Sequence, residues 1–200
     1  HRSLGSVGDN FSSANVIDQL SGASAIGHVR YSTTGETVIR NVQPLFADLA
    51  GGGLAIAHNG NITNATQLRH RLEKRGSIFQ STMDTEVIVH LMATCPSPGF
   101  VEKLTDALHH LVGAYSLVIQ TNDALIGARD PLGVRPLVLG ELDGSYILCS
   151  ETCALDIIGA KFVRDVEPGE VVVIDDAGLR SLHPFPGAVK NRFCVFEYVY

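Results

Sequence analysis

Apolar residues recur at helical spacing in the middle of the chain. Leu68 and Leu72 lie four residues apart, and Val87 and Leu91 repeat that spacing further on. Such a repeat places the apolar side chains on one face of a helix. The pattern predicts helices over 64–74, from about 84 to just before Pro96, and over 100–111.

Short apolar or β-branched runs bounded by turn residues occupy most of the remaining chain. Only the stretch 151–158 interrupts the later runs with a helical pattern. Because the helices cluster in the middle, the order of elements favours α+β layers over a repeated βαβ unit. The predicted strands cover 24–31, 54–57, 114–120, 124–128, 137–140, 146–149, 162–166 and 171–174.

Composition narrows the class of protein. With 200 residues, 45% of them hydrophobic, the chain is long enough for a core. A net charge of −6 argues against nucleic-acid binding, which needs a basic face. No apolar run reaches the roughly 18 residues of a membrane span, and no leader is recognisable. Four cysteines are too few for a disulfide framework, so we expect a reduced, cytoplasmic protein.

The most informative short motif follows the apolar run 54–57, where the chain reads His-Asn-Gly-Asn. The Asn59 side-chain amide and the Gly60 backbone N–H are two neutral donors that could stabilise an oxyanion. Asn-Gly is also a common turn dipeptide, and these two residues alone favour the turn.

Two charged residues stand at predicted element ends. Arg30 closes the strand 24–31 and could grip a carboxylate; the alternative is a surface ion pair. Asp84 begins the second helix and could bind an ammonium group; the alternative is a simple N-cap. Together with Asn59 and Gly60 they predict a pocket for an amino acid. No Gly-x-Ser-x-Gly elbow or adjacent Cys–base pair supplies a nucleophile.

The histidines and cysteines do not form a metal motif. Cys149 and Cys153 are separated by three residues, unlike the two-residue spacing common in zinc sites. We interpret these two thiols and Cys95 as buried structural groups. The residues interpreted as packed or capping histidines, rather than bases, are His28, His58 and His90.

Longer strings, in order along almost the whole chain, carry a family resemblance. The sequence resembles the glutaminase domains of the amidophosphoribosyltransferase family, the glutamine phosphoribosylpyrophosphate amidotransferases. The matching strings cover 27–33, 41–45, 57–61, 76–80, 84–86, 130–137, 150–154, 166–170 and 196–200.

The resemblance implies a four-layer αββα sandwich of the N-terminal-nucleophile hydrolase type. It also implies that an N-terminal cysteine attacks the glutamine side-chain amide and that its own amino group is the base. Asn59 and Gly60 would form the oxyanion hole. The loop 31–35, with Tyr31 and Thr33, would close over the substrate. Arg30 would hold the glutamine carboxylate, and Asp84 its ammonium group.

The same resemblance sets expectations for the whole protein. Residues 1–200 would be a glutaminase domain incomplete at its N-terminus, lacking the nucleophile and therefore inactive alone. Residues 191–200 would run on toward a phosphoribosyltransferase domain. There, with Mg²⁺, ammonia would convert 5-phosphoribosyl 1-pyrophosphate to 5-phosphoribosylamine, the first step of de novo purine synthesis. We also expect a homo-oligomer, a tetramer by resemblance. Cys194 matches a 4Fe–4S ligand position in one branch of the family; a structural thiol is the alternative.

Two other readings of the motifs stay open. A sister amidotransferase such as glucosamine-6-phosphate synthase would share the fold and the glutamine pocket. A non-catalytic amino-acid-binding module could keep the fold without the nucleophile. Tyr31 after Arg30, the string 76–80 and the turn 130–137 favour the phosphoribosyl enzyme over the sugar enzyme.

Overall fold

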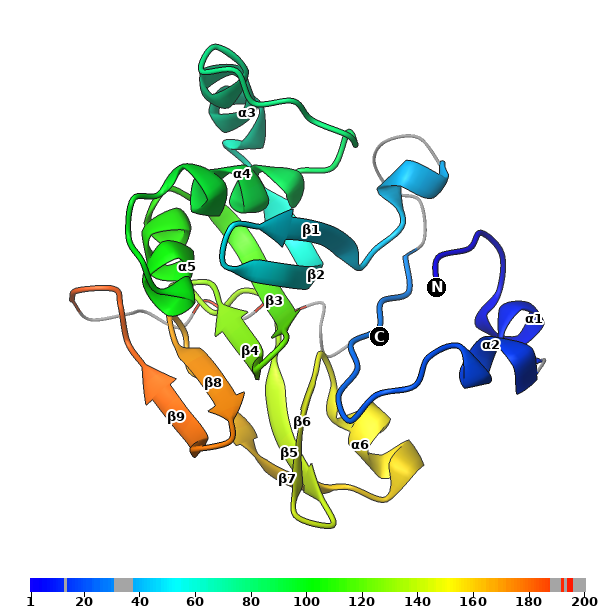
Figure 1. The fold of residues 1–200 in the computed structure, drawn as a ribbon. Coiled ribbons are helices and arrows are strands. Elements are labelled where there is room, and N and C mark those ends of the chain that lie inside the picture. The colour runs from blue at the N-terminus through cyan, green and yellow to red at the C-terminus, as the bar shows by residue number, and fades with distance from the viewer. Residues whose placement is uncertain (13, 31–37, 188–191, 193, 196–200) are drawn as a thin grey trace.

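A six-stranded antiparallel sheet and a smaller three-stranded sheet form the framework (Figure 1). The computed structural model describes residues 1–12, 14–30, 38–187, 192, 194 and 195. The larger sheet has the order β1-β2-β3-β4-β8-β9 and the smaller one the order β6-β5-β7. The strands are β1 (Leu45–Leu49), β2 (Gly52–Ile62), β3 (Gly113–Thr121), β4 (Ala124–Arg129), β5 (Val138–Leu142), β6 (Ser145–Cys149), β7 (Lys161–Asp165), β8 (Val171–Asp175) and β9 (Gly178–Leu182).

Helices α3 to α6 lie on the outer sides of the two sheets, whereas α1 and α2 stand apart from them (Figure 1). The larger sheet is covered by helices from the middle of the chain, and α6 lies beside the smaller sheet (Figure 1). No described helix has the length and apolar character needed to cross a bilayer. The helices are α1 (Val7–Asn10), α2 (Ala14–Asp18), the 3₁₀ turn η1 (Ile39–Asn41), α3 (Ala65–Glu73), α4 (Glu86–Thr94), α5 (Phe100–His109) and α6 (Thr152–Ile158).

The alternation of side chains along the strands separates two cores. On β2 and β3, Ile56 and Ile119 are paired and both face the core shared with α3, α4 and α5. On β8, Val173 belongs to that core, whereas its neighbour Val172 faces the second core between the sheets. This period of two is what a sheet packed on both faces requires.

Two glycines show how closely the two sheets approach each other and how closely α6 approaches the smaller sheet. A Cβ on Gly127 of β4 would lie 2.9 Å from a Leu148 methyl carbon of β6. A Cβ on Gly140 of β5 would lie 2.5 Å from a Leu155 methyl carbon of α6. The order of layers is therefore helix, sheet, sheet, helix. The predicted α+β, four-layer αββα fold is confirmed.

The predicted helices agree with the structure to within about two residues at their ends. Among the strands, one prediction was wrong, one was too short, and two strands were missed. Residues 24–30 are not part of a strand, and Val29 is 75% exposed rather than packed on a sheet. The strand predicted over 54–57 extends from Gly52 to Ile62. β1 and β9 were not predicted, because their polar positions mask the apolar alternation.

Candidate functional site

The second half of β2 loses its strand partner on one edge. β1 pairs with β2 only as far as Leu45 opposite Ile56, whereas β3 pairs with β2 through to Ile62. Beyond β1 the buried side chain of Gln43 takes over. Its Oε1 accepts from the His58 N–H at 2.7 Å, and its Nε2 donates to the His58 carbonyl at 3.2 Å. Gln43 therefore substitutes for one residue of a strand.

Gly60 presents the next N–H on that same edge. In an extended strand the N–H groups of residues two apart point the same way, so the Gly60 N–H lies on the edge of the His58 N–H. Gly60 has a φ of +147°, and a Cβ there would overlap the carbonyl oxygen of Ala114. The pair Asn59-Gly60 is thus part of a strand. The prediction that favoured a turn from these two residues alone was wrong.

The Asn59 side chain lies on the face of the larger sheet that is turned toward the smaller sheet. It is paired with Ser116 of β3, so both side chains point toward the space between the two sheets. Both residues line a cavity of about 290 Å³ there. The Ser116 hydroxyl is buried without a hydrogen-bond partner among the described residues. The end of β2 therefore offers an amide side chain on one face and a backbone donor at its edge.

Asp84 is held against the end of β2 by hydrogen bonds. Its Oδ2 accepts from the Ile62 N–H at 2.9 Å, and its Oδ1 lies 3.5 Å from His58 Nδ1. Burial alone would raise the pKa of Asp84. The hydrogen bond and charge of His58, with the Ile62 N–H, outweigh it and hold the pKa below its ordinary value. Asp84 is therefore a carboxylate at neutral pH.

The alternative role predicted for Asp84, an N-cap, is wrong. Thr85 occupies the N-cap position of α4, and its side chain makes no capping hydrogen bond. The Asp84 side chain instead crosses to β2, because the Ile62 N–H lies within reach of its carboxylate.

The segment before Asp84 is anchored by buried polar groups. Glu86 accepts from the N–H groups of Gln80 and Ser81 at 2.6 and 2.8 Å. The Arg69 guanidinium lies 3.9 Å from the centre of the Phe79 ring and donates to the Ser81 carbonyl at 2.7 Å. These contacts fix the segment that carries Asp84 onto α3 and α4.

The segment with Arg30 approaches β2 through His28. His28 Nε2 lies 3.5 Å from Gln43 Nε2, the atom that also donates to the His58 carbonyl. Burial first, and then the charges of His58 and Arg30, lower the pKa of His28 to about 4. Arg30 itself is half-buried. Tyr31 and Thr33 lie outside the described residues, so their predicted substrate contacts stay predictions.

One cleft brings the described site residues together. It has a volume of about 980 Å³, and Arg30, Asn59, Gly60 and Asp84 all line it. A cation, an anion and two neutral donors therefore share one space. This combination fits an amino acid that carries a carbonyl on its side chain. Sequence reasoning did not assign roles in this cleft to Gln43, His58, Arg69, Arg135 and Glu151, which also line it.

The thiols of the described residues do not form a metal centre. Cys95 is buried as predicted, but Cys149 is half-buried and Cys153 is exposed, which corrects the prediction of buried thiols. Both belong to the surface where β6 meets α6. Cys194 is free and half-buried, and it joins no group of three or more metal-ligand side chains in the described part of the chain. Since a 4Fe–4S cluster takes four thiolates, these residues do not by themselves build one.

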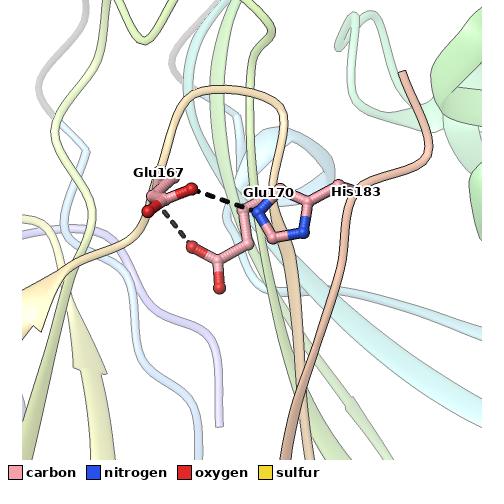
Figure 2. A group of neighbouring side chains, drawn as sticks. All are labelled: Glu167, Glu170 and His183. Atoms are coloured by element: carbon pink, nitrogen blue, oxygen red, sulfur yellow. Dashed lines mark hydrogen bonds and ion pairs between the residues drawn. The ribbon is translucent and has the colours of Figure 1, made fainter. Parts of the chain in front are cut away.

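A second polar cluster lies away from the cleft. Glu167, Glu170 and His183 place one ligand-type atom each within 4.8 Å of one another (Figure 2). However, both Glu170 oxygens already accept from Arg164, at 2.7 and 2.8 Å, and the Glu167 N–H adds a third bond at 2.6 Å. Because the arginine already neutralises this carboxylate, the cluster is a structural ion-pair network that ties β7 to the turn before β8.

Known proteins share both the sequence and the fold. The family described as "Glutamine amidotransferase domain" matches residues 28–156. An amidophosphoribosyltransferase of Rhizobium etli is 51% identical over 203 residues, which cover 100% of this chain and 41% of that protein. A chloroplastic amidophosphoribosyltransferase of Glycine max is 49% identical and covers 98% of this chain and 35% of that protein.

A solved structure extends the similarity to three dimensions. The glutamine phosphoribosylpyrophosphate amidotransferase of Bacillus subtilis, complexed with ADP and GMP, superposes with a TM-score of 0.81 at 43% identity. The match covers 86% of this chain and 37% of that one. The chain belongs to the family of glutamine amidotransferase domains. It spans about two fifths or less of the length of these relatives.

Proposed function

We propose that this chain binds L-glutamine in the cleft and stabilises the oxyanion formed during hydrolysis of the side-chain amide. The observation that carries the proposal is the convergence of Arg30, Asp84 and the Asn59–Gly60 pair on one space. The Arg30 guanidinium would pair with the ligand's α-carboxylate through two hydrogen bonds. The Asp84 carboxylate would accept from its α-ammonium group.

The chemistry needs a nucleophile as well as this pocket. A thiolate attacks the amide carbon, and the carbonyl oxygen becomes an oxyanion to which Asn59 Nδ2 and the Gly60 N–H would donate. The C–N bond then breaks to release ammonia, and water hydrolyses the thioester to glutamate. By the family resemblance, the attacking thiolate would be that of an N-terminal cysteine.

The names of the relatives support a role in a longer enzyme. We propose that ammonia passes to a phosphoribosyltransferase domain, where 5-phosphoribosyl 1-pyrophosphate becomes 5-phosphoribosylamine with Mg²⁺. The relatives named above are amidophosphoribosyltransferases, which favours this enzyme over glucosamine-6-phosphate synthase. The homo-oligomer, the cytoplasmic location and the iron–sulfur role of Cys194 stay predictions.

A substitution in the longer protein tests the proposed function. Asn59→Ala should lower glutamine-dependent turnover by about 10²–10³-fold, the range for loss of one oxyanion donor. Turnover with free ammonia should not change, because ammonia bypasses the glutamine site. Asn122→Ala, at an exposed position between β3 and β4, is the matched control and should change neither rate. An equal loss of both activities in Asn59→Ala would refute the oxyanion role.

The non-catalytic alternative is separated by the same assay. An amino-acid-binding module would bind glutamine in calorimetry, but the longer protein would produce no glutamate from it. Formation of glutamate that depends on Asn59 would exclude that alternative.

A further inference from the structure

His58 lies between the two parts of the cleft that would contact the ligand. It is 4% exposed and sits on β2 directly before Asn59, with its ring on the helix-facing side of the sheet. Its Nδ1 lies 3.1 Å from Thr85 Oγ1 and 3.5 Å from Asp84 Oδ1. Its Nε2 lies 2.9 Å from the point that a Cβ on Gly60 would occupy.

The hydrogen bonds around His58 have one consistent direction. A carboxylate only accepts, so the Thr85 hydroxyl donates to Asp84 Oδ1, at 3.4 Å. The Thr85 oxygen can then accept from His58 Nδ1 at 3.1 Å, and the same ring nitrogen also faces Asp84 Oδ1 at 3.5 Å. The contacts thus run from the imidazole through the buried hydroxyl to the carboxylate. Asp84 is held on its other oxygen by the Ile62 N–H.

A buried histidine in this arrangement lowers the stability of the fold more than a side chain that only fills the space would. His58 Nε2 is buried and has no hydrogen-bond partner among the described residues. Such an atom typically costs about 1–3 kcal/mol of stability. An aliphatic side chain would fill the same space without that cost, but it could not hold Thr85 and Asp84.

We propose that His58 is a positioning residue: through Thr85 it orients the Asp84 carboxylate toward the α-ammonium group of the ligand. This inference rests on the proposed function, in which Asp84 meets that ammonium group. The ring also fixes the distance between Asp84 and Gly60, because it packs between them. One buried side chain thereby links the ammonium site to the oxyanion donor.

Two substitutions by amide side chains distinguish the roles of the two ring nitrogens of His58. In His58→Asn the amide nitrogen reaches the position of Nδ1 and can still donate to Thr85. In His58→Gln the amide extends to the position of Nε2 and leaves Thr85 without that donor. Thr85→Ser, which keeps the hydroxyl, and Thr85→Val, which removes it at nearly constant shape, form a second pair if either His58 variant fails to fold.

The first measurement needs no ligand. Titration of the Asp84 carboxyl carbon by NMR should give a low pKa in the wild-type chain and in His58→Asn, and a higher one in His58→Gln. The charged groups Arg30, Arg69, Arg135 and Glu151 line the same cleft and are identical in all variants. Equal Asp84 titrations in the two His58 variants, or in the two Thr85 variants, would overturn the proposal.

The second measurement compares two ligands by calorimetry, L-glutamine and glutaramic acid, which is glutamine without its ammonium group. His58→Gln should weaken L-glutamine about tenfold and leave glutaramic acid unchanged, whereas His58→Asn should change neither by much. Equal weakening of both ligands would show a merely structural role. If Asp84→Asn does not weaken L-glutamine, the proposed function fails at Asp84, while the titration still decides whether His58 orients that carboxylate.

Discussion

The two halves of β2 share one strand but differ in what surrounds them. Gly52–Ala57 lies between β1 and β3, and its side chains Leu54 and Ile56 are almost fully buried in the main core. His58–Ile62 keeps β3 on one side, but on the other side a single Gln43 side chain replaces the strand. The first half uses its backbone donors for the sheet. In the second half the Gly60 N–H lies on the edge that β1 does not cover, where we propose that it donates to a ligand.

The largest effect should come from replacing one glycine in each half, Gly60 or Gly53, by alanine. Gly60→Ala forces a Cβ into the Ala114 carbonyl oxygen at a φ of +147°, so it should cost about 4 kcal/mol of unfolding free energy or prevent folding. A Cβ on Gly53 would meet the exposed Phe46 ring at 3.2 Å and Asp48 Oδ1 at an ordinary 3.9 Å, so Gly53→Ala should cost less than about 1 kcal/mol. Urea denaturation measures both. Similar losses at the two positions would contradict the contrast between the halves.

The next largest effect should show how far the edge of β2 depends on the Gln43 side chain. Gln43→Ala leaves the His58 N–H and carbonyl without partners, so it should lower the unfolding free energy by about 2 kcal/mol. Gln120→Ala is the control, because it removes one exposed bond to the Ser24 carbonyl at 3.0 Å. The control should lie within about 0.5 kcal/mol of the wild type. If Gln43→Ala is no worse than the control, the edge of β2 does not depend on this side chain.

A smaller effect should appear in binding alone. Arg30→Lys replaces a planar guanidinium by a point charge, so the affinity for L-glutamine should fall about tenfold while stability stays the same. Arg71→Lys on the exposed side of α3 serves as the control and should not alter the affinity. Calorimetry with unchanged affinity in Arg30→Lys would remove Arg30 from the ligand site.

The smallest effect concerns pH and His28, which contacts Gln43. Its pKa is about 4 in the folded chain, against an ordinary 6.5, so folding favours the neutral ring. Its contribution to stability is complete above pH 6.5 and is lost as the pH falls toward 4. Between pH 7 and 5 we expect a loss of about 1 kcal/mol, allowing for partial exposure, that is missing in His28→Gln. If the unfolding free energies of the wild type and of His28→Gln depended on pH in the same way, this would contradict the burial of a neutral His28 ring.

The sequence predicted helices α3 to α6 and most strands, because their side-chain periods are simple, but it did not predict the short helices α1, α2 and η1. The apolar face of α4, with Val87, Ile88 and Leu91 buried, follows directly from its spacing. The prediction of a strand over segment 24–30 was wrong, because a short run with apolar residues before a polar loop is typical of a strand, while the described backbone of this segment joins none. Pairing between distant segments decides such cases, and local pattern does not contain it.

The site residues were predictable in identity but not in geometry. Residue type and resemblance predict Arg30, Asn59, Gly60 and Asp84, and the cleft brings all four together. Local pattern does not reveal that Gln43 completes the edge of β2 or that His58 contacts Asp84, since 15 and 26 positions separate these partners. His58 was interpreted as a packed histidine. It is indeed buried, but its contacts give it a role in the site.

The measurement that tests the central claim most directly is an NMR titration of the ¹⁵N-labelled chain with L-glutamine. The account predicts that the backbone amide of Gly60 and the side-chain amide of Asn59 shift with a common saturation curve, while the amide of Gly53 stays in place. Saturable shifts elsewhere that leave Gly60 and Asn59 unchanged would contradict the claim that the open edge of β2 receives the ligand.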